Sequence, residues 1–286
     1  MPETYGAHEC RVYYVQESTY GQTPANPSMT GVNVESVEPS ISPSLIQVRT
    51  VGSRDPIALY RGLRKPTLKI VGFLGVGSMA LNFVNQAAVN LNSYSIQVLY
   101  FKGSWSSPSD VISLLFKGMR ADKVTVEGSV DEAPKATFEF VGQDLEVGTS
   151  KITGATYNDP SAINPPYDVK IYRGVMDILR VTDWKFSVEN NLKAVPVVRS
   201  TNWHLLKYLC ARHRELNGEL TFEFEDKTEF DDVINDTEFS LKFEFGGGYS
   251  SATFSNCKWE DVQTPTRVED LVSLKARFTA RSITIA

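Results

Sequence analysis

The sequence contains an internal repeat, and this repeat limits the possible folds more than any other feature. Residues 34–53 align with residues 181–200 without a gap. The matching positions are Val34 with Val181, Ser40 with Ser187, Leu45 with Leu192, Val48 with Val195, Val51 with Val198 and Ser53 with Ser200. Because such a repeat encodes one structural unit twice, the chain is expected to fold as two copies of one domain.

Three further blocks repeat in the same order along the chain. They pair Leu68 and Ile70 with Leu220 and Phe222, then Tyr94, Ile96 and Val98 with Phe239, Leu241 and Phe243, and finally residues 135–138 with residues 275–278. A length of 286 residues also suggests two domains. We therefore predict one domain over residues 1–147, including an N-terminal arm. The second covers residues 148–286, with the linker near residues 154–167.

Apolar residues alternate with polar residues in both halves, which is the pattern of strands with one buried face. The clearest segments are residues 219–225 and 238–245. Further strands are predicted at residues 11–15, 45–51, 68–73, 94–101, 124–130, 136–141, 169–172, 184–188, 252–255 and 272–279. The fold class is therefore mainly β: two tandem antiparallel β-sandwich or partly closed barrel domains, each with one or two short helices. Periodicity and capping signals predict these helices at residues 82–91, 107–115, 202–216 and 228–234.

Charge and cysteine usage exclude several classes of protein. The net charge is -5, opposite in sign to that of proteins that grip nucleic acid through its phosphates. Three widely spaced cysteines, Cys10, Cys210 and Cys257, do not form a disulfide framework and favour a reducing folding compartment.

The most apolar stretch, residues 70–84, is shorter than the roughly 20 residues of a membrane helix. The sequence opens without a signal peptide, so no membrane partner is expected.

The sequence offers no convincing catalytic or metal-binding pattern. The glycine-rich residues 72–78 lack the lysine of a phosphate loop and the spacing of a dinucleotide loop. His204, Cys210 and His213 would not all share one helix face, and a structural zinc site needs a fourth close ligand. We expect no catalytic residue, no cofactor and no metal, so the chain is predicted not to be an enzyme.

Residues 184–225 resemble the tail tube proteins of long-tailed bacteriophages and related archaeal viruses. The shared pattern is a strand beginning S-[IV]-[ED]-N-N-L, a variable loop and a G-x-L-T-x-x-F strand. It is carried here by Ser187, Asn190, Asn191, Leu192, Gly218, Leu220, Thr221 and Phe224. Residues 17–24 also resemble the opening of such proteins. The first repeat departs from the pattern, because Pro43 and Ser44 stand where the second has Asn190 and Asn191.

The resemblance implies a structural virion protein that assembles in the host cytoplasm into a hollow siphovirus-type tail tube. The family stacks six-fold rings, so two copies per chain imply a trimeric ring with pseudo-six-fold symmetry. A hexamer whose second copy decorates the outside is the rival arrangement. The implied partners are further copies of the chain, a tape-measure protein, a tail terminator and tail-tip proteins, with DNA present only transiently in the lumen.

Two groups of residues are candidates for this function. Four acids on polar strand faces, Glu219, Glu223, Glu238 and Glu244, are candidates to face the channel, where like charge would keep DNA from adhering. The alternative is that these acids lie on ordinary solvated faces. The non-periodic residues 17–33 and 52–65 are candidate assembly loops, since such segments often order on assembly. Their candidate contact residues are Gln22, Thr23, Pro24, Arg54, Asp55 and Arg61.

Two other functions remain open from the sequence. The inner tube of a contractile injection system is expected to share the fold, but those tubes more often carry one copy per chain. A carbohydrate-binding or adhesin module of a tail tip would use exposed aromatic rings to stack on sugars. Its candidate rings are Trp105, Trp184, Trp203 and Trp259.

Overall fold

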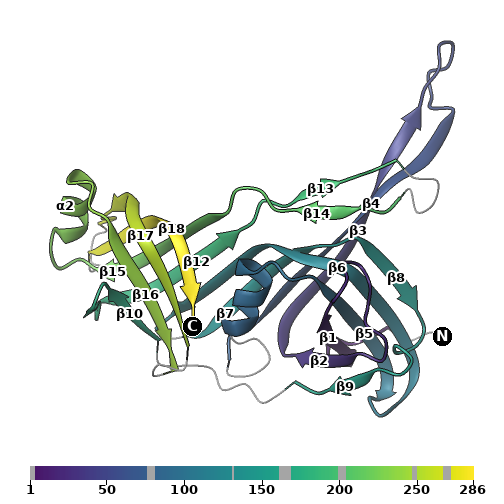
Figure 1. Ribbon diagram of the computed structural model, residues 1–286, viewed down its shortest axis with the longest axis horizontal. Coiled ribbons are helices and arrows are strands. Elements are labelled where there is room, and N and C mark those ends of the chain that lie inside the picture. Colours follow the sequence, from purple (N-terminus) through teal and green to yellow (C-terminus); the bar gives the residue numbers. More distant parts are fainter. Residues whose placement is uncertain are drawn as a thin grey trace.

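The chain folds almost entirely into β-strands, as the alternating sequence predicts (Figure 1). The computed structural model describes residues 4–75, 81–130, 132–160, 169–198, 204–246, 250–266 and 272–286. Helical structure in these ranges is limited to short segments. They are η1 (Ala7–Glu9), α1 (Leu81–Val84), which continues into the single π-helical turn η2 (Asn85–Val89), and α2 (Thr228–Ile234). No helix among the described residues has the length and apolar character needed to cross a bilayer.

The strands are numbered in chain order. Those of the N-terminal part are β1 (Cys10–Gln16), β2 (Ser28–Val32), β3 (Val34–Val48), β4 (Ala58–Phe73), β5 (Tyr94–Ser104), β6 (Ser107–Ser129), β7 (Glu132–Val141), β8 (Asp144–Gly148) and β9 (Thr156–Asn158). Those of the C-terminal part are β10 (Val169–Arg173), β11 (Met176–Asp177), β12 (Val181–Glu189), β13 (Lys193–Val195), β14 (Tyr208–Cys210), β15 (Glu215–Glu223), β16 (Phe239–Phe245), β17 (Ser250–Gln263) and β18 (Ser273–Ile285).

Sixteen strands join into one mixed sheet, and β13 and β14 form a separate ribbon. The only parallel pair among the described strands is β2 with β9. No barrel closes within this part of the chain, because the sheet keeps open edges. The predicted β class is therefore correct, and a closed barrel is not formed.

The strand order is the same in both parts of the chain. The N-terminal strands follow the order β1, β5, β6, β7, β4, β3, and the C-terminal strands follow β10, β16, β17, β18, β15, β12. Every neighbouring pair in both series is antiparallel. The strands that occupy the same place include those that carry the repeated sequence blocks: β3 with β12, β4 with β15, β5 with β16 and β7 with β18.

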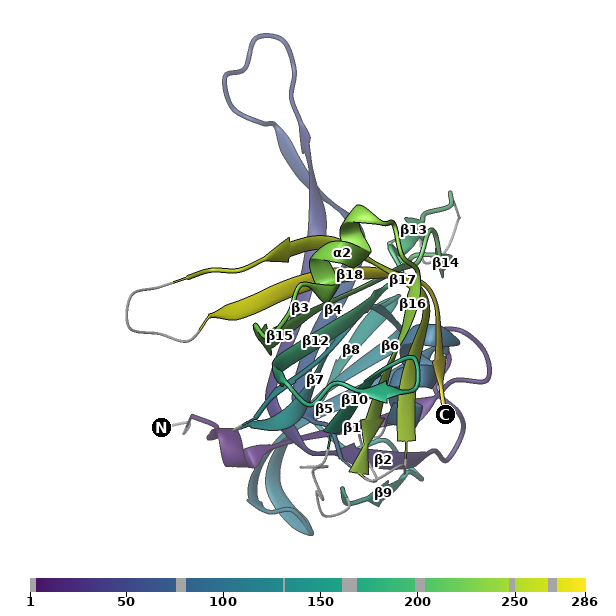
Figure 2. The same cartoon turned by 90° about the vertical axis from the view of Figure 1, so that its left-hand side faces the viewer.

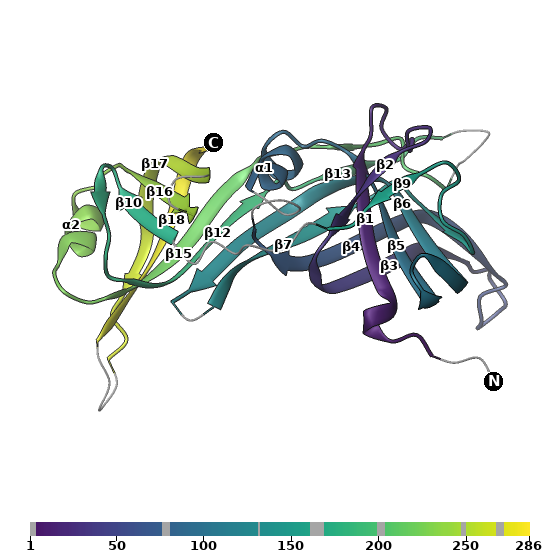
Figure 3. The same ribbon diagram turned by 90° about the horizontal axis from the view of Figure 1, so that it is seen from below.

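Strand β6 connects the two series. Its first half pairs with β5 and β8, and its second half lies between β7 and β12. The β6–β12 ladder runs from Asp183 opposite Ser129 to Glu189 opposite Lys123. Gly128 allows close packing here, because a Cβ at this position would lie 2.7 Å from the indole of Trp184. The sheet therefore continues without interruption from one part of the chain to the other (Figure 3).

The sheet folds back on itself around an aromatic core. In the C-terminal part, β12 and β16 are separated by three strands in the sheet order. Nevertheless the rings of Phe186 on β12 and Phe243 on β16 lie 5.1 Å apart, and both side chains are fully buried. The outward faces of these two strands therefore point to opposite sides of the molecule. One continuous cluster of buried residues runs through both parts of the chain.

The helix predicted at residues 107–115 is wrong, because this segment belongs to β6. Val111, Ser113 and Leu115 alternate inward and pair with Phe101, Leu99 and Gln97 of β5. The Ser-Pro sequence that suggested a helix start instead begins β6, directly after the turn at residues 105–106, and Pro108 lies opposite Gly103. Long-range pairing has overridden a local capping signal.

The helix predicted at residues 202–216 is also wrong over the described part of that range, and residues 202–203 lie outside it. Residues 208–210 form β14, and β15 begins at Glu215. Leu206 and Leu209, which suggested an apolar helix stripe, are buried individually against the N-terminal part. The predicted loop at residues 17–33 contains β2, and the predicted linker contains β9. The helices predicted at residues 82–91 and 228–234 are confirmed as α1 with η2 and as α2.

Asn190 at the end of the β6–β12 ladder should be important for stability. Its buried amide donates to the carbonyl oxygens of Ala88 and Ala121, at 3.1 and 3.0 Å. Asn190→Ala leaves both acceptors unpaired, so we expect a loss of about 2 kcal/mol in the free energy of unfolding, measured by urea denaturation. The matched control is Asn158→Ala, which removes an exposed hydrogen bond to Ser28 and should cost under about 0.5 kcal/mol. Equal losses in the two variants would contradict the role given to Asn190.

Candidate assembly surface

A row of alternating charges crosses the outward face of the continuous sheet. The strand registers place Glu127 of β6 opposite Lys185 of β12, Lys185 opposite Glu219 of β15, and Glu219 opposite Arg277 of β18. The row continues to Asp261 of β17. Lys185 lies 3.6 Å from Glu127, and Arg277 lies 3.1 Å from Glu219. Each exposed pair adds little stability. Together, however, the pairs give this face a nearly balanced charge.

Two of the four predicted channel-facing acids lie on this surface. Glu219 and Glu223 both point outward from β15, whose alternate residues Leu220 and Phe222 are buried. Glu244 points outward from β16, on the opposite side of the core. There it pairs with Lys242 at 2.5 Å. Glu238, just before β16, accepts a hydrogen bond from Asn256 and lies 3.9 Å from Lys258. The four acids therefore do not form one surface.

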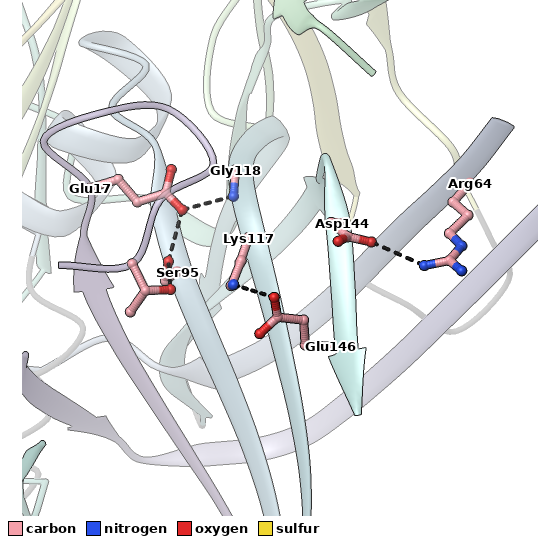
Figure 4. Close-up of polar contacts among 8 residues, drawn as sticks. Glu17, Arg64, Ser95, Lys117, Gly118, Asp144 and Glu146 are labelled. Carbon is pink, nitrogen blue, oxygen red and sulfur yellow. Dashed lines mark hydrogen bonds and ion pairs between the residues drawn. The ribbon is translucent and has the colours of Figure 1, made fainter. Parts of the chain in front are cut away.

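The first predicted assembly loop is held by a buried carboxylate (Figure 4). Glu17 Oε1 accepts hydrogen bonds from Ser95 Oγ and the Gly118 amide, and its Oε2 accepts from the Gly21 amide, each at 2.8 Å. Sequence reasoning did not identify Glu17. Thr23 Oγ1 lies 2.8 Å from the same Ser95 hydroxyl.

Glu17 closes the turn at residues 17–21 and ties it to Ser95 of β5 and Gly118 of β6, so this end of the loop is fixed to the body of the chain. Among its candidate contact residues, Gln22 remains exposed, and Thr23 and Pro24 are partly buried. Pairing beside this loop also fixes the start of β8, where Asp144 lies 3.4 Å from Arg64 (Figure 4).

The second predicted assembly loop is the end of a long arm formed by β3 and β4. Residues 44–61 extend away from the rest of the molecule (Figures 1 and 2). Arg54 and Asp55 are exposed near its tip, and Arg61 is exposed on β4. The arm also exposes large apolar side chains, including Leu45 at 63% and Leu59 at 62%. Exposed apolar residues in such numbers mark an interaction surface.

The equivalent segment after β12 is folded onto the body instead. The β13–β14 ribbon lies against the N-terminal part, where Arg120 donates to the carbonyl of Leu209 at 2.8 Å. Gln143 donates to the carbonyl of Leu206 at 2.7 Å. Leu206 and Leu209 are buried as a result. Two segments that follow equivalent strands thus differ: one is covered within the chain, and the other is exposed.

Several strand edges lack a partner among the described residues, and two of them occupy the places next to β4 and β18. Strand β3 pairs with β4 alone, and residues 258–263 of β17 pair with β18 alone. Sequence reasoning identified neither edge. One signal was present, because Pro39 and Pro43 occur within an alternating segment, and proline in a sheet is typical of an edge strand.

The tryptophans that could stack on sugars are packed into the protein where they are described. Trp184 and Trp259 are 7% exposed and lie in the aromatic core. Trp105 stacks on Tyr13, and the Lys151 ammonium lies 3.5 Å from the centre of its ring system. Trp203 lies outside the described residues. Trp184 and Trp259 therefore offer no sugar-binding platform, and the described surface gives the adhesin alternative no support.

A sheet with open edges and an exposed apolar arm is typical of a structural protein that associates with further chains. The sequence agrees: the chain belongs to the phage tail tube protein family, which it matches over residues 7–280. It is therefore a structural protein of the virion tail and not an enzyme.

Solved structures give only distant likenesses. A chain of the anti-feeding prophage baseplate is 12% identical, with a TM-score of 0.42, and the match covers 53% of this chain and 100% of that chain. A chain of the sheath/tube terminator of an extracellular contractile injection system is 14% identical, with a TM-score of 0.34, covering 44% of this chain and 98% of that chain. Neither likeness carries an argument about function. No curated protein matches the sequence.

Reversing one charge in the row should weaken the fold in a salt-dependent way. Lys185→Glu turns two opposite-charge pairs, with Glu127 and Glu219, into like-charge pairs. We expect a loss of about 1 kcal/mol in unfolding free energy at low salt. Most of this loss should disappear at 1 M salt, where the Debye length is about 3 Å. The control Lys185→Gln should cost about half as much. A loss unaffected by salt would show that the charge row contributes nothing.

Proposed function

We propose that this chain is the subunit of a hollow tail tube of a long-tailed, siphovirus-type virus, and that it polymerises as stacked rings through which viral DNA passes. One observation carries the proposal beyond family membership. Two series of six strands with the same order are joined edge to edge by the β6–β12 ladder. This arrangement supports two tandem tube-type domains, at residues 1–147 and 148–286.

We propose a trimeric ring with pseudo-six-fold symmetry. Six-fold rings of the family type need six sheet units, and each chain supplies two. The rival is a hexamer whose second domain decorates the outside. The β6–β12 ladder favours the trimer, because it makes both domains neighbours in one sheet instead of placing one outside the other.

We propose that the face bearing the charge row lines the channel. It is the outward face of the strands that run from one domain into the next, so it would remain continuous around a ring. Glu219 and Glu223 would then face the lumen together with Lys185 and Arg277. Paired charges of both signs would present DNA with a weak net field, which limits adhesion.

The proposed partners follow from this role. Further copies of the chain would bind within and between rings. A tape-measure protein would occupy the lumen during assembly in the host cytoplasm, and a terminator and tail-tip proteins would bind the two ends. The exposed arm at residues 44–61 is the best candidate for contacts between chains, because its apolar side chains are uncovered in the single chain.

The proposal is tested by negative-stain electron microscopy of the purified protein over a concentration series, with averaged end-on views. We expect rings or tubes with a central hole, and a ring mass equal to three chains by mass photometry. A ring of six chains would overturn the trimer and retain the tube. Compact particles without a hole at every concentration would overturn the tube function itself.

The arm should be needed for assembly and not for folding. In the double variant Leu45→Ser, Leu59→Ser, we expect the unfolding free energy to change by under about 0.5 kcal/mol, because both side chains are exposed. Tube formation should require a higher protein concentration, measured by sedimentation. The control is Val147→Ser, an exposed apolar residue of β8 away from the arm. Unchanged assembly of the double variant would exclude the arm from the contacts.

A further inference from the structure

Strand β3 has backbone hydrogen-bonding groups along its free edge that point toward the position of a further strand. The Gly142 amide donates to the Pro66 carbonyl at 2.9 Å, so the backbone of Pro66 faces β7. Pro66 lies opposite Ile41 in the β3–β4 ladder. In an antiparallel ladder, opposite residues either both face each other with their hydrogen-bonding groups or both face away. The backbone groups of Ile41 therefore point to the free edge, and those of Val37 and Pro39 do so by alternation.

Strand β12 has the same backbone geometry, and there the outward-pointing groups are hydrogen-bonded to β6 within the chain. On β12, the backbone amide of Asn190 donates to the backbone carbonyl of Asp122 at 2.7 Å. The backbone carbonyl of Thr182 accepts from the backbone amide of Val130 at 3.1 Å. The backbone groups of the even-numbered residues between them, including Phe186 and Val188, therefore face β6. Strand β12 holds the same place in its series as β3. No described strand supplies to β3 the pairing that β6 supplies to β12.

Side-chain burial also shows that β12 is covered where β3 is exposed. Val188 of β12 is completely buried beside β6, whereas Ile41, its counterpart in the gap-free repeat, is 40% exposed. A partner strand would cover Ile41 in the way that β6 covers Val188.

The opposite edge of the sheet, on β17, is a second free edge among the described strands and could supply the partner strand for β3. Strand β17 holds the place of β6, and its residues 258–263 have β18 on one side and no described strand on the other. Helix α2 lies beside this segment, since Trp259 donates to Asp232 at 3.3 Å. Its residues Val233 and Ile234 remain exposed, at 44% and 79%. In the N-terminal part, η2 lies at the β6–β12 ladder, where Ala88 accepts from Asn190. The free edge of β17 therefore already has a helix where the internal ladder has one.

We infer that residues 38–42 of β3 in one chain pair antiparallel with residues 259–263 of β17 in a second copy, repeating between chains the β6–β12 ladder found within the chain. This inference rests on the proposed function and names the strands that join neighbouring subunits. The sheet would then run from chain to chain, carrying the charged face with it.

The internal ladder also gives the register. Ser187 lies opposite Thr125. Ser187 corresponds to Ser40 in the gap-free repeat. Thr125 lies opposite Thr137 of β7. Thr137 matches Arg277 of β18 in the repeated blocks, and Arg277 lies opposite Asp261. Asp261 of β17 is therefore the equivalent of Thr125 of β6. Ser40 should therefore lie opposite Asp261 between chains.

Charge supports this register over its nearest alternative. A slip of two residues keeps every side chain on its face. In one direction it would place Glu38 directly opposite Asp261, and like charges in that position are destabilising. The proposed register places the uncharged Ser40 there.

Paired cysteines test the inference in the full-length chain. Ser40→Cys with Asp261→Cys should form a disulfide between chains, because opposite residues whose backbone groups face away lie about 4.5 Å apart at Cα. The background carries Cys210→Ser to remove the exposed native thiol. Cys257 is buried, and burial raises the pKa of its thiol to about 12, which keeps it out of exchange. The half-buried Cys10 is monitored in the background alone.

Two matched pairs serve as controls. Thr125→Cys with Ser187→Cys tests the equivalent internal position and should form a disulfide within the single chain, at any concentration. Glu38→Cys with Asp261→Cys tests the slipped register and should give no product above the background, because diagonal neighbours lie about 7–8 Å apart. Products are separated on non-reducing gels after mild oxidation, and the same samples are viewed end-on by electron microscopy.

The expected result is covalent dimers and trimers for the Ser40 and Asp261 pair, with the series ending at three chains. A product only with Glu38→Cys would overturn the register. Rings in the microscope with neither product would overturn the strand pairing and leave the tube function standing. Failure of every variant and of the unmodified protein to form rings would overturn the proposed function, and the pairing with it.

Discussion

The ladder between β6 and β12 is the interaction on which the rest of the structure depends. Backbone amides and carbonyls in a buried strand need partners, and β12 obtains those on one side only from the last part of β6. This requirement fixes how the two parts of the chain sit side by side. It also aligns their polar faces into one surface and brings the β13–β14 ribbon onto the N-terminal part, where Arg120 and Gln143 bind its carbonyls. Asn190 then closes the end of the ladder by bonding two carbonyls of the N-terminal part.

Much of the strand content could be predicted, because alternation is a local property of the sequence. Residues 239–245 and 136–141 show it clearly, and both are strands. The two segments wrongly predicted as helices are instead determined by contacts with distant parts of the chain. Residues 107–115 carry a helix-start signal of modest strength, and the long pairing of β6 with β5 outweighs it. Leu206 and Leu209 are apolar because each is buried against a distant part of the chain. A helix stripe and two separate contacts look alike in sequence.

The candidate surface was less predictable than the fold. Acidic residues on polar strand faces can be read from alternation, so Glu219 and Glu244 were equally good candidates. Which side of the core each strand takes depends on how the sheet folds back, which the contact between Phe186 and Phe243 records. Free edges are harder still, because an edge is defined by the strand that is missing beside it. Glu17 was missed for a related reason: two of its three donors, Ser95 and Gly118, come from distant parts of the chain, and no local spacing reveals them.

Pro39 and Pro43 have a consequence for the behaviour of the free protein. An exposed sheet edge invites indiscriminate stacking of strands into aggregates. At this edge, Pro39 offers a carbonyl and no amide, and Pro43 likewise lacks an amide. A strand that needs a donor at every second residue cannot use such an edge fully. The prolines therefore disfavour indiscriminate strand pairing at this edge, while Val37 and Ile41 still offer an amide and a carbonyl to one matching strand.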